Sequence, residues 1–113
     1  MTQRLDAARQ LLDQGRPDAA QQVMDAVLSQ ASMLQEEDVV GSCSLLAWLL
    51  ALRGEPVRAR MMAGLAVELA RCCTTNAQQV QAHLDQVRTM RALGDREGAL
   101  ACLRRAHSLS ERK

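Results

Sequence analysis

Small and bulky apolar residues recur at matching positions in three successive segments of this chain. If the first segment keeps its own residue numbers as repeat positions, the second and third segments are offset by 39 and 79 residues. Position 20 is then alanine in every segment, and positions 8, 11, 24 and 27 are apolar in every segment. These residues are Ala8, Ala47 and Val87; Leu11, Leu50 and Met90; Ala20, Ala59 and Ala99; Met24, Ala63 and Leu103; and Val27, Ala66 and Ala106. A pattern that repeats about every 20 to 50 residues is typical of stacked helical hairpins.

Each segment also carries a glycine five residues before its alanine at position 20. The three glycines are Gly15, Gly54 and Gly94. Glycine supplies the left-handed turn that ends a helix, and Pro17 and Pro56 then fit the first turn of a following helix, where the missing N–H of proline costs nothing. Asp95 is expected to cap the corresponding helix of the third segment. The pattern therefore predicts six helices, over residues 3–14, 17–32, 37–53, 56–73, 77–93 and 96–110.

Composition supports an all-helical chain. Apolar residues make up 48% of the 113 residues, yet phenylalanine, tyrosine and isoleucine are absent, so the aromatic and β-branched residues that sheets favour are scarce. Alanine, leucine, glutamine, arginine and methionine are abundant, and all five are strong helix formers. We predict one all-α domain over residues 1–113, built from three antiparallel hairpins at about 3–33, 37–73 and 77–110.

The three segments resemble the tetratricopeptide repeat, which places small residues at positions 8, 20 and 27 and bulkier apolar residues at positions 4, 7, 11 and 24. The resemblance implies a short right-handed α-solenoid of three hairpins whose surface binds another protein. The chain departs from the family at position 4, where Arg4, Cys43 and His83 replace a large apolar residue. We expect His83 to be a core or boundary histidine whose hydrogen bonds are satisfied.

In this family, positions 2, 5, 9, 12 and 13 of the first helix of a repeat line a concave groove. The resemblance therefore implies a partner-binding groove lined by Leu5, Arg9, Leu12, Trp48, Leu84, Arg88 and Arg91. The apolar side chains would anchor an amphipathic helix or an extended peptide, and the arginines would pair with its acidic residues. Trp48 also lies in the apolar run of residues 45–52, so its sequence context fits a core position equally well.

The predicted groove lacks the carboxylate clamp with which some family members grip the acidic C-terminus of heat-shock proteins. That clamp uses lysine, asparagine and arginine side chains at defined repeat positions. The matching residues here are Leu5, Arg9, Leu45, Gln81 and Asp85. We therefore expect a protein partner of another kind.

The last predicted helix carries a stripe of apolar and small residues that no later helix in the sequence covers. The stripe consists of Leu100, Leu103, Ala106 and His107. A stacked array normally needs a polar cap over its last apolar face. We predict that Leu100, Leu103 and His107 form an interface with a second copy, giving a homodimer, or with a small co-chaperone. The alternative is a short array that leaves a lightly apolar face exposed.

The sequence offers no catalytic, cofactor-binding or metal-binding constellation. It contains two histidines and lacks an HExxH motif, a glycine-rich phosphate loop and a nucleophile elbow, so we expect no enzymatic activity. The four cysteines are Cys43, Cys72, Cys73 and Cys102. They do not show metal-ligand spacing, and we expect them to be reduced and buried. Neither a cofactor nor a metal ion is expected.

Charge is nearly balanced overall but unevenly distributed. The net charge of +1 gives no overall field for nucleic acid or an anionic membrane. Residues 1–40 contain seven acidic and three basic residues, whereas residues 41–113 contain six acidic and eleven basic residues. Ends of about −4 and +5 would favour head-to-tail self-association, although ordinary solvated faces explain them too.

No segment predicts export or membrane insertion. The N-terminus lacks a continuous apolar stretch, and the longest apolar run, at residues 45–52, is too short to span a bilayer. We therefore expect a cytoplasmic protein that binds neither nucleic acid nor membrane.

These expectations favour a non-enzymatic interaction protein, most concretely a small bacterial chaperone or adaptor that shields a helical or extended partner. Arginine supplies thirteen of the fourteen basic residues, a bias that suggests a GC-rich bacterial genome. The layout of three hairpins is similar to that of the small tetratricopeptide-type chaperones of type III secretion. Two alternatives are a regulatory arm that senses or antagonises a transcriptional or signalling protein, and a structural subunit that assembles with itself.

Overall fold

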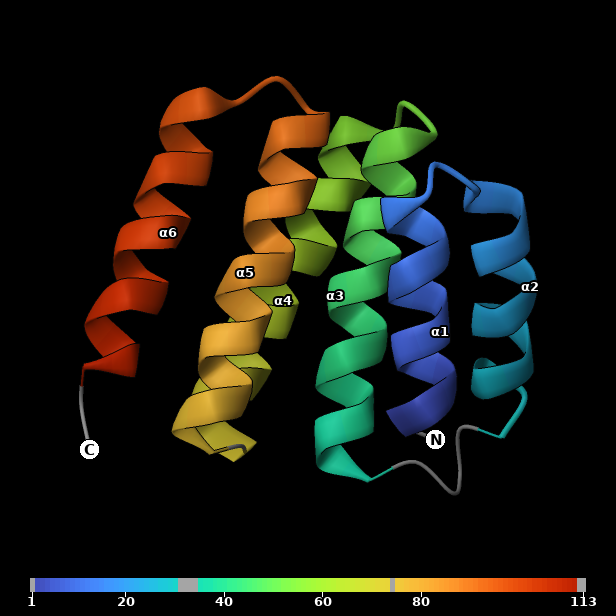
Figure 1. Ribbon diagram of the computed structural model, residues 1–113, viewed down its shortest axis with the longest axis horizontal. Helices are drawn as coiled ribbons and strands as arrows, with labels where there is room; N and C mark the ends of the chain where they lie inside the picture. Colours follow the sequence, from blue (N-terminus) through green and yellow to red (C-terminus); the bar gives the residue numbers. More distant parts are fainter. Residues whose placement is uncertain (1, 31–34, 74, 112–113) are drawn as a thin grey trace.

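The computed structural model describes residues 2–30, 35–73 and 75–111 of the chain. Six helices account for almost all of these residues, and Figure 1 shows their arrangement. The helices are α1 (Thr2–Asp13), α2 (Pro17–Leu28), α3 (Glu36–Leu52), α4 (Pro56–Cys73), α5 (Asn76–Ala92) and α6 (Arg96–Ser110). The predicted all-α fold of three antiparallel hairpins is confirmed, with each odd-numbered helix packed on the even-numbered helix that follows it.

Left-handed glycines end the first helix of every hairpin, as the repeat pattern predicts. The φ angles of Gly15, Gly54 and Gly94 are +72°, +77° and +76°, in the region that residues with a Cβ atom avoid. Pro17 and Pro56 are the first residues of α2 and α4, so each of these helices begins two residues after its glycine. The repeat pattern thus marks the turns of all three hairpins.

Side chains cap the first turns of α5 and α6. Asp95 accepts a hydrogen bond of 2.8 Å from the backbone N–H of Gly98, which confirms its predicted role at the start of α6. Thr75 and Gln78 form a reciprocal capping box at the start of α5. Backbone donors that would otherwise lack a partner at both helix starts are therefore satisfied.

The second helix differs most from its predicted extent. α2 ends at Leu28, whereas the sequence predicts a helix as far as residue 32. The hydroxyl of Ser29 donates a hydrogen bond of 2.7 Å to the backbone carbonyl of Ala26, an acceptor that is left open at the helix end. Residues 29 and 30 form a turn, and residues 31 and 32 lie outside the described residues. The other five helices agree with their predicted bounds to within one residue.

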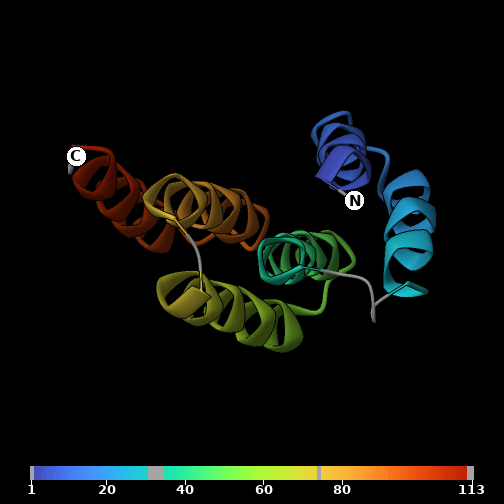
Figure 2. The same ribbon diagram turned by 90° about the horizontal axis from the view of Figure 1, so that it is seen from below.

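The helices stack around α3. Figure 2 shows α3 between α1 on one side and α5 on the other, with α2 and α4 farther out. α3 contacts both α1 and α5, and these three helices form the concave face; α6 packs on α5 at the C-terminal end. This arrangement brings side chains of α1 and α5, far apart in the sequence, to the two sides of one face.

Two main clusters of buried side chains hold the stack together. The first joins the α1–α2 hairpin to α3 through Leu5, Ala8, Leu12, Ala20, Met24, Val27, Leu45, Trp48 and Leu49. The second joins α3 and α4 to α5 and α6 through Ala47, Ala63, Val87, Met90, Ala99 and Cys102. Ala8 and Ala20 are completely buried, and their small side chains let α1 and α2 approach closely.

Candidate functional site

Three apolar residues predicted to line the concave groove are buried in the core instead. Leu5, Leu12 and Trp48 have exposed fractions of only 4%, 3% and 6%, because α1, α2 and α3 enclose them in the first core cluster. The expectation that these side chains offer an open apolar surface is therefore corrected, since that surface is already used in folding. Of the two positions that the sequence allows for Trp48, the structure shows the core position.

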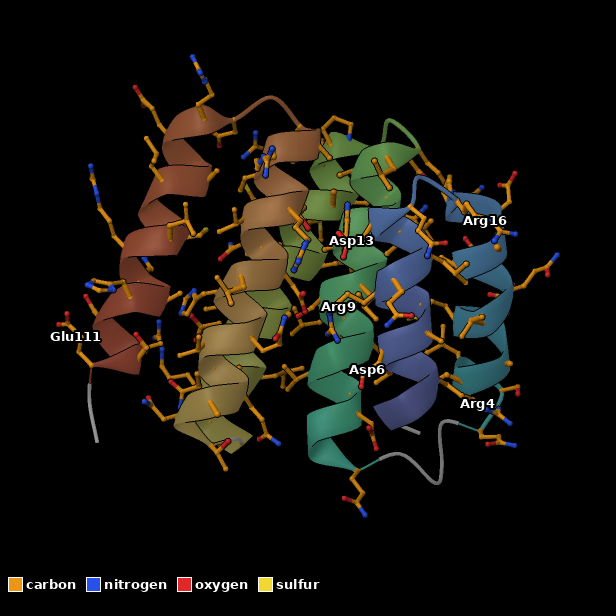
Figure 3. The ribbon with its side chains drawn as sticks, viewed as in Figure 1. Arg4, Asp6, Arg9, Asp13, Arg16 and Glu111 are labelled. Atoms are coloured by element: carbon orange, nitrogen blue, oxygen red, sulfur yellow. The ribbon has the colours of Figure 1, made fainter. Side chains whose placement is uncertain are left out.

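A buried salt bridge joins α1 and α5 across the concave face. The Nε and Nη2 atoms of Arg9 each donate a hydrogen bond of 3.0 Å to the carboxylate of Asp85, although 76 residues separate the two. Asp85 is 1% exposed and the side chain of Arg9 is 18% exposed, so water reaches the pair only from the side of the arginine. Asp6 accepts a further hydrogen bond of 2.9 Å from Nη1 of Arg9. Figure 3 shows Asp6, Arg9 and Asp13 on the side of α1 that faces α5.

The guanidinium of Arg9 is held in its charged form. Burial by itself lowers the pKa of Arg9, but the hydrogen bonds and charges of Asp85 and Asp6 outweigh burial and raise this pKa overall. A guanidinium in this setting stays protonated at every pH at which the protein is folded. The link between α1 and α5 is therefore insensitive to any change in the protonation of Arg9.

Arg88 makes a second link between α5 and α1. Its Nε lies 3.3 Å from a carboxylate oxygen of Asp13, and its Nη1 lies 3.6 Å from a carboxylate oxygen of Asp85. The guanidinium carbon of Arg88 lies 5.3 Å from the centroid of the Trp48 ring, a distance typical of a cation–π contact. Arg9 and Arg88, which we predicted to pair with acids of a partner, are thus paired with acids of their own chain.

A small pocket with both polar and apolar walls remains on the concave face beside these ion pairs. Its volume is about 240 Å³, and its lining includes Leu5, Arg9, Val40, Ser44 and Gln81. Pockets that bind small molecules usually measure about 300–1,000 Å³, so this pocket is smaller than a typical small-molecule site. Ion pairs therefore close most of the predicted groove.

The last hairpin carries a larger and more apolar candidate surface, which we call the terminal face. It is a hollow of about 610 Å³ lined by Val87, Arg91, Arg96, Ala99, Leu100 and Leu103. Val87 and Ala99 form its buried floor, while Leu100 and Leu103 are 52% and 43% exposed. The structure thus brings together two of the three residues of the predicted interface.

His107, the third residue of the predicted interface, lies outside this hollow. Its Nε2 is 2.9 Å from a carboxylate oxygen of Glu111, one turn further along α6. Of the remaining predicted groove residues, Leu84 is half-buried, whereas Arg91 is exposed and belongs to the terminal face. The prediction that His107 shares a surface with Leu100 and Leu103 is therefore corrected, because its side chain pairs along its own helix.

Comparison within the chain shows what the terminal face lacks. Met24 and Leu103 occupy the same repeat position, yet Met24 is completely buried and Leu103 is 43% exposed. Met24 is buried because α3 places Leu45, Trp48 and Leu49 against the first hairpin. Among the residues that the structure describes, no helix covers Leu103 in the same way. The terminal face therefore exposes a repeat position that a neighbouring helix covers in the first hairpin.

Two cations border the terminal face. Arg91 and Arg96 both line the hollow, and neither forms an ion pair with another residue of the described ranges. Ionised side chains beside an apolar surface select a partner by charge more than they strengthen its binding. The face is therefore suited to an apolar surface flanked by acidic residues.

Sequence reasoning missed Asp13 and Asp85 as partners of the groove arginines. The signal was available as opposite charges at facing positions, because Arg9 and Asp13 lie on α1 while Asp85 and Arg88 lie on α5. Helices that flank one concave face can pair such charges across it. Whether they do depends on how closely the two helices approach, which the spacing of the repeats does not specify.

An exposed apolar strip on α4 was also not predicted. Val57, Met61 and Leu65 follow one another at intervals of four residues and are 70%, 68% and 46% exposed. Met61 also lines a hollow of about 370 Å³ with Leu49 and other residues of α3. This strip lies on a different helix from the terminal face, and it provides a control surface of similar chemistry.

The three cysteines whose side chains the structure describes divide into buried and exposed thiols, and the side chain of Cys73 lies outside the described ones. Cys43 and Cys102 are buried as predicted, and burial raises the pKa of both thiols. Cys72 is exposed, so the prediction of burial is wrong for this residue, whose side chain faces outward on α4. Within the described ranges, no group of three or more histidine, cysteine or acidic side chains is placed to hold a metal ion.

Comparison with known proteins identifies all three hairpins. A family model described as tetratricopeptide repeat matches residues 2–26, 40–64 and 80–105. No curated protein and no solved structure matches the chain. None of the described helices is both long enough and apolar enough to cross a membrane. The three matches fall on the three hairpins in turn, and the chain therefore belongs to the tetratricopeptide repeat family, whose repeats form protein–protein interaction modules.

Proposed function

We propose that this protein is a non-enzymatic adaptor or chaperone of the bacterial cytoplasm that binds an amphipathic helix of a protein partner at the terminal face. The exposure of Leu103, at a repeat position where Met24 is buried by a neighbouring helix, carries this proposal. Repeat proteins extend by stacking a further helix on such positions. A helix supplied by another protein would bury Leu100 and Leu103 in the same manner.

Charge at the rim of the terminal face defines the partner more closely. Arg91 and Arg96 would pair with acidic residues that flank the apolar stripe of the partner helix. A basic helix would instead be repelled by the two arginines. The concave groove is the less favourable location, because a ligand there must first break the contacts of Arg9 and Arg88 with Asp85 and Asp13.

A pair of matched variants tests this location. Leu103→Asp places a carboxylate in the terminal face, and Met61→Asp makes the same change on the exposed strip of α4. The full-length variants, with folding checked by circular dichroism, are used to capture proteins from extracts of the producing cell. A partner retained by wild type and Met61→Asp but lost with Leu103→Asp supports the proposal. A partner retained by all three proteins contradicts it.

The identity of the captured protein decides the finer class. A secretion substrate, held before export, would assign the protein to the chaperones that it resembles in layout. A kinase or a DNA-binding protein would assign it to the regulatory arms. In either case we expect the contact to map to an amphipathic helix with acidic flanks.

Head-to-tail self-association is a second candidate, because the two ends of the stack expose opposite charges. The side chains of Asp13 and Asp18 are 48% and 96% exposed on the first hairpin, while Arg91 and Arg96 lie on the third. Assembly driven by such charges weakens as ionic strength rises. Sedimentation at low salt distinguishes the candidates: a monodisperse monomer contradicts self-association and leaves the binding of a partner helix unaffected.

A further inference from the structure

A hollow lined by cations lies where α4, α5 and α6 meet. α4 and α6 both pack on α5, as Figure 2 shows, and a hollow of about 460 Å³ lies among these three helices. Its polar lining includes Arg71 of α4, His83 of α5, and Arg104, Arg105 and Ser108 of α6. No acidic residue of the described ranges lines it. The residues that line the terminal face are entirely different, so the two surfaces are separate.

One imidazole nitrogen of His83, Nδ1, lacks a hydrogen-bond partner among the described residues. The side chain of His83 is 8% exposed, and this nitrogen is buried. The sequence analysis predicts a histidine with satisfied hydrogen bonds, and the structure corrects that prediction. Burial and the charges of Arg105 and Arg71 lower the pKa of His83, and they outweigh a side-chain hydrogen bond with Gln86 that raises it, so the neutral imidazole is favoured. A neutral imidazole can donate one hydrogen bond, and a ligand in the hollow would give Nδ1 an acceptor.

The positive charges of the arginines in this hollow are largely uncompensated by acidic side chains of the described residues. Arg104 and Arg105 form no ion pair within the described part of the chain. Arg71 lies 3.6 Å from Glu68, and both of these side chains are largely exposed, so their pairing is weak. Three guanidinium groups around an unpartnered imidazole concentrate positive potential at one place, although the whole chain is almost neutral.

Contacts outside the hollow hold its walls in place. The side-chain amide of Asn76, in the first turn of α5, donates a hydrogen bond to the backbone carbonyl of Leu109, which lines the hollow on α6. The capping box of Thr75 and Gln78 fixes the same end of α5. The arrangement of His83 with Arg104 and Arg105 is therefore built into the packing of α5 on α6.

We propose that this hollow binds an oxyanion of the phosphate class, held by the guanidinium groups of Arg104 and Arg105 and by the Nδ1–H of His83. Guanidinium groups present paired donors that match phosphate oxygens, and an imidazole donor adds a third direction. A phosphate offers acceptors on several sides and carries up to two charges at neutral pH, whereas a carboxylate has two oxygens in one plane and a single charge. Donors that come from both α5 and α6 therefore suit a phosphate better.

Inorganic phosphate is the first probe. The full-length protein is titrated with phosphate at neutral pH, with chloride adjusted to keep ionic strength constant, while NMR records the imidazole resonances of His83 and His107. We expect a saturable shift at His83 and a smaller one at His107. A double variant with Arg104→Gln and Arg105→Gln should bind phosphate at least about tenfold more weakly, because two charged hydrogen-bond donors are lost.

The matched control removes two other unpaired arginines from the same helical hairpin. A double variant with Arg91→Gln and Arg96→Gln has the same change in net charge, but neither residue lines this hollow. We expect it to bind phosphate like the wild type. The proposal is overturned if phosphate shifts His83 no more than chloride does, or if both double variants lose affinity equally. All these substitutions are at exposed side chains, so the fold should be retained.

A second arm of the experiment distinguishes the sources of the phosphate group. A short peptide with one phosphoserine is compared with inorganic phosphate in the same titration. Binding of the peptide more tightly than inorganic phosphate would assign the site to a phosphorylated partner protein. Equal or weaker binding would assign it to a free phosphorylated compound. Either assignment holds only if the double variant with Arg104→Gln and Arg105→Gln binds the same probe more weakly than the wild type.

Discussion

Arg9 on α1 and Asp85 on α5 form a two-fold hydrogen-bonded ion pair across the concave face, with both N···O distances at 3.0 Å. Asp85 is almost completely buried, so the pair costs desolvation energy that only good geometry can offset. Gln81 also donates a hydrogen bond of 3.1 Å to Asp85, which satisfies a further lone pair. The pair ties the first repeat to the third and closes the groove between them.

Removing Arg9 should destabilise the protein much more than removing an exposed arginine. Arg9→Met leaves a buried carboxylate without its main partner, and we expect the free energy of unfolding to fall by about 2 kcal/mol. Arg53→Met is the matched control, because Arg53 pairs with Asp18 at 3.1 Å but both side chains are exposed. For this variant we expect a loss of at most about 0.5 kcal/mol. Urea denaturation measures both values. Equal losses would show that the Arg9–Asp85 pair contributes no more to the free energy of unfolding than an exposed ion pair.

The single tryptophan reports whether the concave face is closed in solution. Trp48 is 6% exposed and lies under the guanidinium of Arg88. We expect its fluorescence emission to be blue-shifted and protected from iodide and acrylamide in the native protein. Unfolding in guanidinium chloride should shift the emission to the red and remove the protection. A red-shifted, readily quenched emission from the native protein would instead place Trp48 in an open groove.

Replacing glycine with alanine should change the free energy of unfolding in opposite directions at Gly54 and Gly64. Gly54 has a φ of +77°, so Gly54→Ala should lower the free energy of unfolding by about 1–2 kcal/mol. Gly64 lies within α4, and a Cβ atom there would meet no atom within 4 Å. Gly64→Ala should therefore raise the free energy of unfolding by about 0.5–1 kcal/mol, because alanine is the better helix former. Thermal denaturation decides the signs: a stabilising effect of Gly54→Ala would contradict the left-handed turn, and a destabilising effect of Gly64→Ala would contradict the open space at Gly64.

Thiol reactivity should distinguish the cysteines. Burial raises the pKa of Cys43 and Cys102, which keeps both thiols protonated and out of reach of reagents at neutral pH. Cys72 is exposed and should react quickly. Labelling with iodoacetamide, followed by peptide mapping of a Cys73→Ser variant, measures each site separately. We expect modification at Cys72 alone until the protein unfolds, and rapid labelling of Cys43 or Cys102 in the native state would contradict the packing described for α3 or α6.

The fold follows from local features of the sequence, whereas the closed groove does not. Gly15 and Ala20 act within their own hairpin, so their positions predict turns and helix contacts without knowledge of distant residues. The pair of Arg9 and Asp85 depends on the distance between helices that are separated by two hairpin turns. The repeat register places both residues on one face, but it does not state whether that face is open.

The candidate site also combines features that the sequence predicts with features that depend on the packing of distant helices. The exposure of Leu103 agrees with the apolar stripe predicted on the last helix, and its repeat position is buried by a neighbouring helix in the first hairpin. The burial of Leu5 and Leu12 could not be predicted, because the positions that the family resemblance assigns to a groove are enclosed here by α2 and α3. The unpartnered Nδ1 of His83 also lay beyond the sequence, since it depends on side-chain packing among α4, α5 and α6.

Photo-crosslinking in the producing cell tests most directly whether the terminal face binds a partner helix. A photoreactive amino acid replaces Leu103 in one full-length variant and Met61 in another, and both side chains are exposed. We predict a crosslink from position 103 to an amphipathic, acid-flanked helix of another protein, identified by mass spectrometry, and none from position 61. Crosslinks from position 61 without any from position 103, or crosslinks from position 103 to a basic or extended segment, would contradict the proposed binding mode.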